Sequence, residues 1–220
     1  MWFAGKVRRV PEAGRPGALR LGFTLARGMR VGLFGGSFNP AHDGHAHVAE
    51  TAALRLGLDK VIWLVSPQNP LKSSHGTPPL AERLASARRV SRGRRQIVTD
   101  AESRMGSQYT LDTLRILKAR FPGVKFVWIM GADNLAGFHR WKGWVEIFRS
   151  VPIAVVARPG ATLASRFGPT ARRFAHARQP SRAGRLLAGS KTPAWTYLRG
   201  PLNFASSTAL RARQAKTGGE

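Results

Sequence analysis

The sequence predicts a doubly wound α/β fold with five to six mostly parallel strands. Short apolar, β-branched runs alternate with segments of helical periodicity along most of the chain. The runs are continuously apolar, which is typical of parallel strands that are buried on both faces of a sheet. At 220 residues and 43% hydrophobic, the chain is long enough to bury the core of one such domain.

The expected elements follow in strict strand–helix order. Strands are expected at residues 30–36, 60–66, 95–100, 124–131, 151–157 and, most weakly, 193–198. Helices are expected at residues 44–56, 79–92, 110–120, 141–149 and 206–213. For the first helix, Asp43 can cap the start and Gly57 can end it. Residues 158–192 are rich in Arg, Ala, Gly and Pro, and are expected to form a long irregular insertion.

The first 28 residues differ in composition from the rest of the chain. They are rich in Arg, Pro and Gly and nearly free of acidic residues. We interpret residues 1–28 as a disordered basic extension, or as an artefact of start-site choice, because Met29 would make a natural start for the fold. A single domain is therefore expected at residues 29–216.

Composition excludes several classes of protein. The chain has no cysteine, which excludes disulfides, thiolate metal sites and a cysteine nucleophile. No apolar run approaches the roughly 18 to 20 residues of a membrane span, and no secretory signal is present. We therefore expect a cytoplasmic protein without membrane contact.

The net charge of +25 has three interpretations. It can be a compositional bias toward arginine with solvated charges, it can attract a polyanionic small substrate, or it can bind nucleic acid. Arginine is spread along the whole chain, so the charge alone does not choose among them.

The strongest signal is the segment that follows the first expected strand. Gly35 and Gly36 let the backbone approach a phosphate closely, and a helix follows directly. A helix N-terminus offers unpaired N–H groups and the positive end of its dipole to an anion. His42 and His45 lie three residues apart at that N-terminus, so both imidazoles can reach one phosphate chain. This pattern indicates phosphoryl or nucleotidyl transfer, in which catalysis consists of positioning and charge stabilisation.

The whole segment from Gly35 to His45, GGSFNPAHDGH, resembles the signature of the HxGH nucleotidyltransferase superfamily. Its GGSFNP form is most similar to the bacterial nicotinate-mononucleotide adenylyltransferases, and the resemblance covers roughly residues 30–213. It implies a Rossmann-like nucleotidyltransferase fold, His42 and His45 as catalytic residues, and Asn39 at the acceptor substrate. It also implies ATP contacts at Gly35, Gly36, Ser37 and Phe38.

A second motif near the C-terminus has three hydroxyls followed by an arginine. Alone, Ser206, Ser207 and Thr208 would form an ordinary helix cap. The segment resembles the family's ISSTxxR motif, with Ala205 in place of Ile. The resemblance implies that Ser206, Ser207, Thr208 and Arg211 hold the ATP phosphates.

Three further segments resemble the parts of the family that choose the acceptor. Residues 67–72 resemble a Pro-rich stretch ending in a basic residue, which implies a substrate contact for Lys72; Leu71 replaces the family's His. Tyr109 and Thr110 match the family's S-Y-T segment, where Thr110 would cap a helix and backbone N–H groups would meet the nicotinate carboxylate. Trp141 would stack on the pyridine ring, although a tryptophan there could equally be core.

The same resemblance extends to the adenosine side. Gly131 and Asp133 match the family's GxD block and would meet adenosine, and Arg158 matches the family's RPG segment beside the nucleotide.

The resemblance implies transfer of the adenylyl group of ATP to nicotinate mononucleotide, giving nicotinate adenine dinucleotide (deamido-NAD) and pyrophosphate in NAD biosynthesis. Mg²⁺ would accompany ATP, and no protein metal site is expected. ATP and nicotinate mononucleotide are the expected partners; nucleic acid is not, and the oligomeric state stays open. The alternatives are another HxGH adenylyltransferase, such as one acting on pantetheine phosphate, and a non-catalytic basic nucleic-acid-binding protein.

Overall fold

The computed structural model describes residues 21–67, 77–159, 162–201, 203, 205–208, 210 and 211. They form a single seven-stranded sheet of order β3-β2-β1-β4-β5-β7-β6, and every strand pair is parallel. The strands are β1 (Arg30–Gly36), β2 (Lys60–Val65), β3 (Gln96–Thr99), β4 (Lys125–Gly131), β5 (Ile153–Val156), β6 (Arg178–Gln179) and β7 (Trp195–Leu198). The predicted doubly wound parallel sheet is confirmed, with one strand more than expected.

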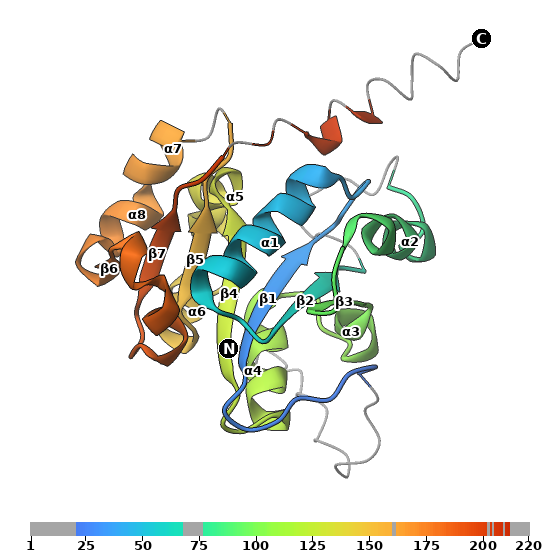
Figure 1. Ribbon diagram of the computed structural model, residues 1–220, viewed down its shortest axis with the longest axis horizontal. Coiled ribbons are helices and arrows are strands. Elements are labelled where there is room, and N and C mark those ends of the chain that lie inside the picture. The colour runs from blue at the N-terminus through green and yellow to red at the C-terminus, as the bar shows by residue number, and fades with distance from the viewer. Residues whose placement is uncertain are drawn as a thin grey trace, which may run out of the picture.

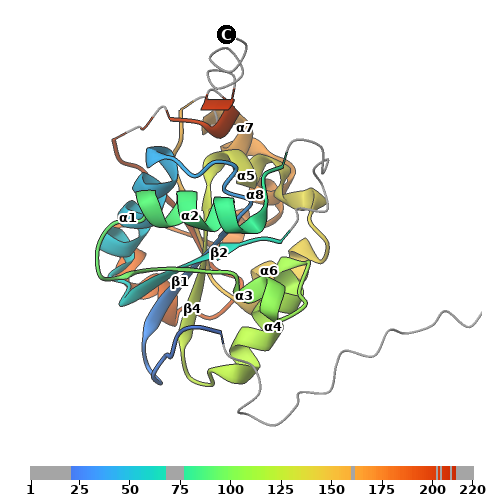
Figure 2. The same ribbon diagram turned by 90° about the vertical axis from the view of Figure 1, so that its right-hand side faces the viewer.

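Helices cover both faces of the sheet (Figures 1 and 2). The α-helices are α1 (Asp43–Leu56), α2 (Leu80–Val90), α3 (Ala101–Arg104), α4 (Thr110–Arg120), α5 (Ala132–Gly137), α6 (Trp144–Ser150), α7 (Thr162–Phe167) and α8 (Pro169–Arg173). The 3-10 helices are η1 (Phe138–Arg140), η2 (Ala175–Ala177) and η3 (Ser181–Gly189). Helices α1 and α2 lie on one face, and α3, α4 and α6 lie on the other (Figure 2).

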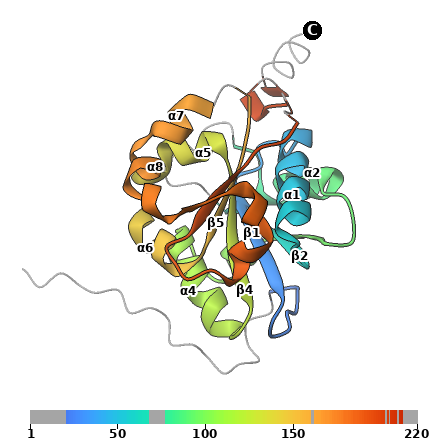
Figure 3. The ribbon, with the colours of Figure 1, turned by 60° about the vertical axis from the view of Figure 1, so that its left-hand side comes forward.

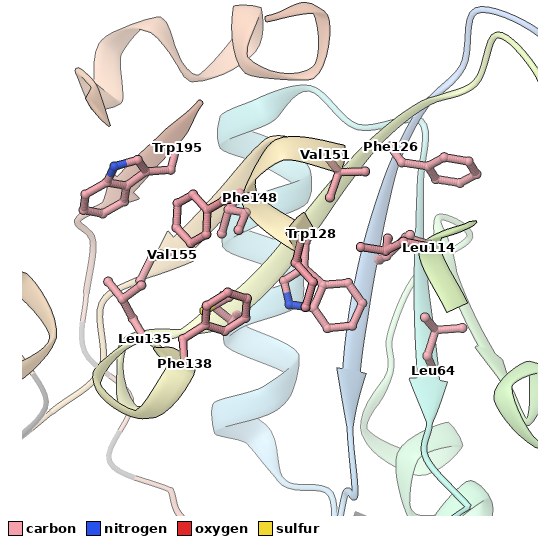
Figure 4. Close-up of a cluster of buried hydrophobic side chains, with 14 of the residues drawn as sticks. Leu64, Leu114, Phe126, Trp128, Leu135, Phe138, Phe148, Val151, Val155 and Trp195 are labelled. Carbon is pink, nitrogen blue, oxygen red and sulfur yellow. The ribbon is translucent and has the colours of Figure 1, made fainter. Parts of the chain in front are cut away.

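Alternate residues of the central strands supply the two halves of the core. From β4, Phe126 and Trp128 pack under α4 and α6, while Val127 and Ile129 pack under α1. Figure 4 shows the first cluster, with Trp128 near its centre. A strand buried on both faces must be apolar at every position, which is why these strands read as continuous apolar runs.

Residues 21–28 differ from the expected disordered extension. Leu21 is 3% exposed and belongs to the core cluster under α4, and its carbonyl accepts a 3.1 Å hydrogen bond from the Thr99 hydroxyl. The Gly28 N–H donates to the Gly123 carbonyl at 2.9 Å. The prediction is therefore wrong for residues 21–28, because a few apolar side chains in an Arg-rich segment suffice to dock it. Residues 1–20 lie outside the described residues.

Residues 158–192 also differ from the expected irregular insertion. Their described part holds α7 and α8, which Figure 3 labels, together with η2, η3 and the two-residue strand β6. Phe174 from this segment stacks on Phe148 of α6 with ring centroids 4.1 Å apart. Strand β6 has a polar sequence and pairs with β7 through Arg178 and Gln179, so it carries no apolar run that would predict a strand.

Candidate functional site

The candidate site lies where the order of the sheet reverses, between β1 and β4. In the order β3-β2-β1-β4-β5, the loops that follow β1 and β4 leave the same edge of the sheet and diverge to opposite faces, which opens a crevice. A cleft of about 570 Å³ occupies this place. Sixteen of the predicted site residues line it: Gly35, Gly36, Ser37, Phe38, His42, His45, Tyr109, Thr110, Gly131, Asp133, Trp141, Arg158, Ser206, Ser207, Thr208 and Arg211.

Two predicted residues remain. Lys72 lies outside the described residues. Asn39 is absent from the lining, and its backbone carbonyl instead accepts a 2.6 Å hydrogen bond from the Arg211 guanidinium. The predicted acceptor contact of Asn39 stays a prediction, while its backbone joins the loop after β1 to the C-terminal segment.

His42 and His45 form a reciprocal cap at the start of α1. His42, not the predicted Asp43, is the N-cap residue: its Nδ1 accepts the Gly44 N–H at 3.1 Å. The His45 Nδ1 accepts the His42 N–H at 3.3 Å, and the two ring centroids are 3.9 Å apart. Because each Nδ1 is an acceptor, each neutral imidazole carries its hydrogen on Nε2. The cap therefore fixes both the position and the tautomer of the two rings.

Burial keeps His42 uncharged. The residue is 4% exposed, and desolvation, followed by the positive charge of Arg158, lowers the pKa of His42 from 6.5 to about 4; Asp133 and Asp43 oppose the shift. At neutral pH the ring is therefore a hydrogen-bond donor without a net charge.

Gly44 of the HxGH motif is required by two close neighbours. A Cβ at this position would lie 2.7 Å from the Ala205 carbonyl oxygen and 2.9 Å from the His42 ring. Any side chain would push the C-terminal segment away or rotate His42 out of its cap. The lack of a side chain at Gly44 thus lets the HxGH motif and the C-terminal motif lie against each other. Sequence reasoning gave Gly44 no role and missed this.

The loop after β1 is anchored by an aromatic residue. Phe38 is 2% exposed, has a positive φ of 46°, and packs against Phe34, His45 and Trp63. A positive φ is costly for a bulky residue, and the surrounding rings hold this one in place. Phe38 lines the cleft, and its ring also packs against that of His45 with centroids 5.1 Å apart.

The C-terminal motif is bonded directly to this loop. The Ser207 hydroxyl donates to the Pro40 carbonyl at 3.0 Å, and Arg211 reaches the Asn39 carbonyl. Arg158, which follows β5, bonds Asp133 at 3.3 Å and the Ala205 carbonyl at 2.9 Å. Segments more than 160 residues apart in sequence are therefore held together around the two histidines.

The other end of the cleft is lined by aromatic side chains. Tyr109 is the N-cap residue of α4 and Thr110 its first residue, so the predicted capping role of Thr110 is wrong. The Lys142 ammonium lies 4.1 Å from the centroid of the Tyr109 ring. Trp141 is half-buried, with its ring 4.8 Å from that of Phe138 and 6.2 Å from that of Trp128. The tryptophan thus serves the core and the cleft at once.

Sequence reasoning missed a buried carboxyl group beside these aromatic residues. Glu102 is 6% exposed, lines the cleft, and accepts a 3.0 Å hydrogen bond from the Thr113 hydroxyl. Burial raises the pKa of Glu102, while hydrogen bonds from Ser66 and Thr113 oppose the shift. The other lining residues that were not predicted are Phe34, Val48, Ser66, Gln108, Trp128, Asn134, Arg140 and Lys142. Most are neighbours of predicted residues, so proximity in sequence was the available signal.

Within the described residues, no three His, Asp or Glu side chains converge as metal ligands, and no helix is long and apolar enough to cross a membrane. The two cleft carboxylates, Glu102 and Asp133, already bond Thr113 and Arg158.

Comparisons with known proteins agree with this geometry. A family model described as cytidylyltransferase-like matches residues 33–213. A protein of Caulobacter sp. (strain K31), named a probable nicotinate-nucleotide adenylyltransferase, is 73% identical over 188 residues, which are 86% of this chain and 100% of that protein. A protein of the same name from Rhizobium meliloti (strain 1021) is 53% identical over 190 residues, 86% of this chain and 100% of that protein.

Solved structures show the same fold at low identity. The nicotinic acid mononucleotide adenylyltransferase of Plasmodium falciparum, complexed with APC or with NaAD, superposes with a TM-score of 0.62 at 14% identity, over 84% of this chain and 83% of that one. The family model and the 53–73% identical relatives place the sequence: the chain belongs to the cytidylyltransferase-like family and, within it, to the nicotinate-nucleotide adenylyltransferases.

Proposed function

We propose that this chain transfers the adenylyl group of ATP to nicotinate mononucleotide and releases pyrophosphate, in NAD biosynthesis, with His42 and His45 as the catalytic residues. The observation that carries the proposal is the pair of capped imidazoles, 3.9 Å apart, in one cleft with basic and aromatic groups. Arg158 and the hydroxyl and arginine side chains of the C-terminal motif could bind the phosphates of the nucleotide. The aromatic side chains at the other end of the cleft, Tyr109 and Trp141, could bind a flat acceptor ring.

The reaction needs no covalent enzyme intermediate. A phosphate oxygen of the acceptor attacks the α-phosphorus of ATP, a new P–O bond forms, and the bond to the bridging oxygen breaks; pyrophosphate leaves with the electron pair. The Nε2–H groups of His42 and His45 donate to the α-phosphoryl oxygens as charge builds on them. A neutral, pre-positioned His42 suits this role, because it needs neither a proton transfer nor a rearrangement during the step.

Basic and hydroxyl groups around the histidines would hold the donor phosphates. Ser206, Ser207, Thr208 and Arg211 line the cleft on the C-terminal side, and Arg158 lines it after β5. Gly131 lies against Asp133 and Arg158, where a Cβ would clash with both, so the glycine lets these two side chains pack against the backbone beside the cleft.

We propose that Mg²⁺ enters with ATP, since the cleft carboxylates are engaged by protein groups. Bound there, the ion would neutralise charge on the transferring phosphates. Of the two cleft carboxylates, Asp133 is the one bonded to a predicted phosphate-binding arginine, and assisting the ion would require it to leave Arg158.

The acceptor would bind at the aromatic end. Trp141 offers a ring face for the pyridine, and Tyr109 and Thr110 offer the N-terminus of α4. Lys142 forms no ion pair among the described residues, so its ammonium over Tyr109 can meet the carboxylate of nicotinate. A nicotinamide group has no charge to offer there. Lys72 stays a predicted contact for the acceptor phosphate.

The test is pyrophosphate release from ATP and Mg²⁺ with one acceptor at a time: nicotinate mononucleotide, nicotinamide mononucleotide or pantetheine phosphate. We expect strong preference for the nicotinate acceptor. Activity with another acceptor alone would overturn the substrate assignment and keep the transfer chemistry, and silence with all three would favour the non-catalytic alternative. A cytoplasmic location and the lack of nucleic-acid binding stay predictions.

A further inference from the structure

One buried arginine holds together the loops at the mouth of the cleft. Arg83 lies on α2, is 2% exposed, and has no carboxylate partner among the described residues. Its guanidinium instead donates four hydrogen bonds to backbone carbonyls: Nε to Pro78 at 3.0 Å, Nη1 to Ser37 at 2.9 Å and Ser66 at 2.6 Å, and Nη2 to Pro67 at 2.8 Å. Four of its five N–H donors are therefore in use.

The carbonyls that Arg83 binds belong to two separate loops. Ser37 lies in the loop of residues 37–41 after β1, here called the phosphate loop, and Ser66 and Pro67 follow β2. Ser37 and Ser66 line the cleft. A buried charge without a counter-ion is costly to keep, and burial lowers the pKa of Arg83. A planar fork with five donors can satisfy four diverging carbonyls at once, whereas a lysine ammonium has three donors at a single point.

Ser86, one turn further along α2, holds the same phosphate loop at a second place. Its hydroxyl is 5% exposed, accepts the Ala41 N–H at 3.2 Å, and donates to the Arg83 carbonyl at 2.9 Å. Ala41 directly precedes His42. Side chains of helix α2 thus bond to the phosphate loop at Ser37 and at Ala41, which are its first and last residues before His42.

We propose that Arg83 and Ser86 are positioning residues for adenylyl transfer, which hold the loop of residues 37–41 so that His42 and His45 face the cleft. The inference rests on the proposed function, because it assigns these residues a role in that reaction. Strand pairing between β1 and β2 runs from Val31 to Gly36 and does not depend on either side chain. Loss of the Arg83 or Ser86 hydrogen bonds should therefore displace the loop more readily than it disrupts the sheet.

The experiment compares Arg83→Lys and Ser86→Ala with two matched controls on the same helix. Arg88→Lys changes an exposed arginine, and Ser91→Ala removes the hydroxyl of the C-cap residue of α2, which bonds the Arg88 carbonyl and no other group in the part of the chain that the structure describes. We measure kcat and KM with ATP and nicotinate mononucleotide, urea unfolding, and the titration of His42 by NMR.

We expect kcat to fall roughly 10- to 100-fold in Arg83→Lys and about 3- to 10-fold in Ser86→Ala, because small displacements of reacting groups are costly, with KM within about threefold of wild type. The pKa of His42 should rise from about 4 toward 6.5 in both variants, since a loosened loop admits water. Both controls should match the wild type.

Variants that fold and match their controls in kcat would overturn the proposal, and so would a fall in kcat with an unchanged His42 titration. If Arg83→Lys fails to fold, Ser86→Ala decides alone. Wild-type protein that is inactive with nicotinate mononucleotide would refute the proposed function instead, and the His42 titration would still show whether α2 positions the loop.

Discussion

The two ends of the cleft are built in different ways. At the phosphate end, the residues bond to one another: His42 and His45 cap a single helix, Arg158 joins Asp133 to Ala205, and Arg211 reaches the loop after β1. At the aromatic end, Trp141 is half-buried and Lys142 is exposed, with its charge over the Tyr109 ring.

The difference separates the two tasks of an adenylyltransferase. Charge stabilisation in the transition state needs donors that do not move, and groups that are hydrogen-bonded to one another provide them. Binding an acceptor requires a surface that a flat ring can enter and leave, which partly exposed aromatic residues provide. We therefore expect substitutions at the phosphate end to lower kcat, and substitutions at the aromatic end to change acceptor KM and acceptor choice.

The largest effect is expected at the phosphate end. His45→Ala should lower kcat roughly 10²- to 10³-fold, the cost of losing one preorganised donor to the transition state. Steady-state pyrophosphate release measures it. His47→Ala, on the same helix but outside the cleft lining, is the control and should retain most activity. Near-normal turnover of His45→Ala would contradict the proposed mechanism and the expected division of kcat and KM effects between the two ends of the cleft.

The buried state of His42 predicts a pH dependence of stability. Its folded pKa of about 4 lies below its ordinary value of 6.5, so between these pH values the unfolded chain binds more protons than the folded one. The free energy of unfolding should fall as the pH drops through this window, by about 2 to 3 kcal/mol for this residue at pH 4.5.

Urea unfolding at pH 7 and pH 4.5 measures this loss. His42→Asn can still cap α1 but cannot titrate, so it should lose less stability on acidification than the wild type. The exposed His176 provides the control, because His176→Asn should keep the wild-type response. Equal losses in all three proteins would show that His42 is not desolvated as the structure indicates.

A smaller effect is expected from Trp141→Leu at the aromatic end. Loss of stacking should raise the KM for nicotinate mononucleotide about 3- to 10-fold and leave the KM for ATP unchanged. Trp144→Leu is the matched control, since Trp144 packs against Phe174 and does not line the cleft. If the KM for ATP rose instead, the two ends would have to be exchanged.

The smallest effect is expected from Lys142→Met. An exposed cation contributes little, so kcat/KM for the nicotinate acceptor should fall only about 2- to 5-fold, with no change for the nicotinamide acceptor. Lys125→Met, outside the cleft lining, controls for the loss of surface charge. Equal losses of kcat/KM for both acceptors would mean that Lys142 does not bind the carboxylate of nicotinate.

Much of the site could be predicted because its residues lie in short segments. The phosphate loop, Tyr109, Gly131, Trp141, Arg158 and the serine-rich motif each follow an expected strand or precede an expected helix, and they line one cleft. Glu102 and Arg83 could not be found in this way. Both are buried polar residues whose partners lie on other elements, and no local pattern marks such a residue.

Residues 21–28 and the strand β6 are the parts of the fold that could not be predicted from the sequence. Leu21 belongs to the core because its carbonyl bonds Thr99, 78 positions away, and its side chain is buried in the cluster under α4. Arg178 and Gln179 form a strand because the edge of β7 is available to them. In both cases the preference of the segment itself is weak, and the partner decides.

The sequence by itself determined six of the seven strands, the parallel sheet and the residue types that the HxGH and serine-rich motifs bring to the cleft, because periodicity and motif spacing are local properties. The tertiary structure alone decided that His42 is the cap and is uncharged, that Asn39 serves Arg211, and that Arg83 joins two loops. These depend on burial and on contacts between distant segments, and both exist only once the chain has folded.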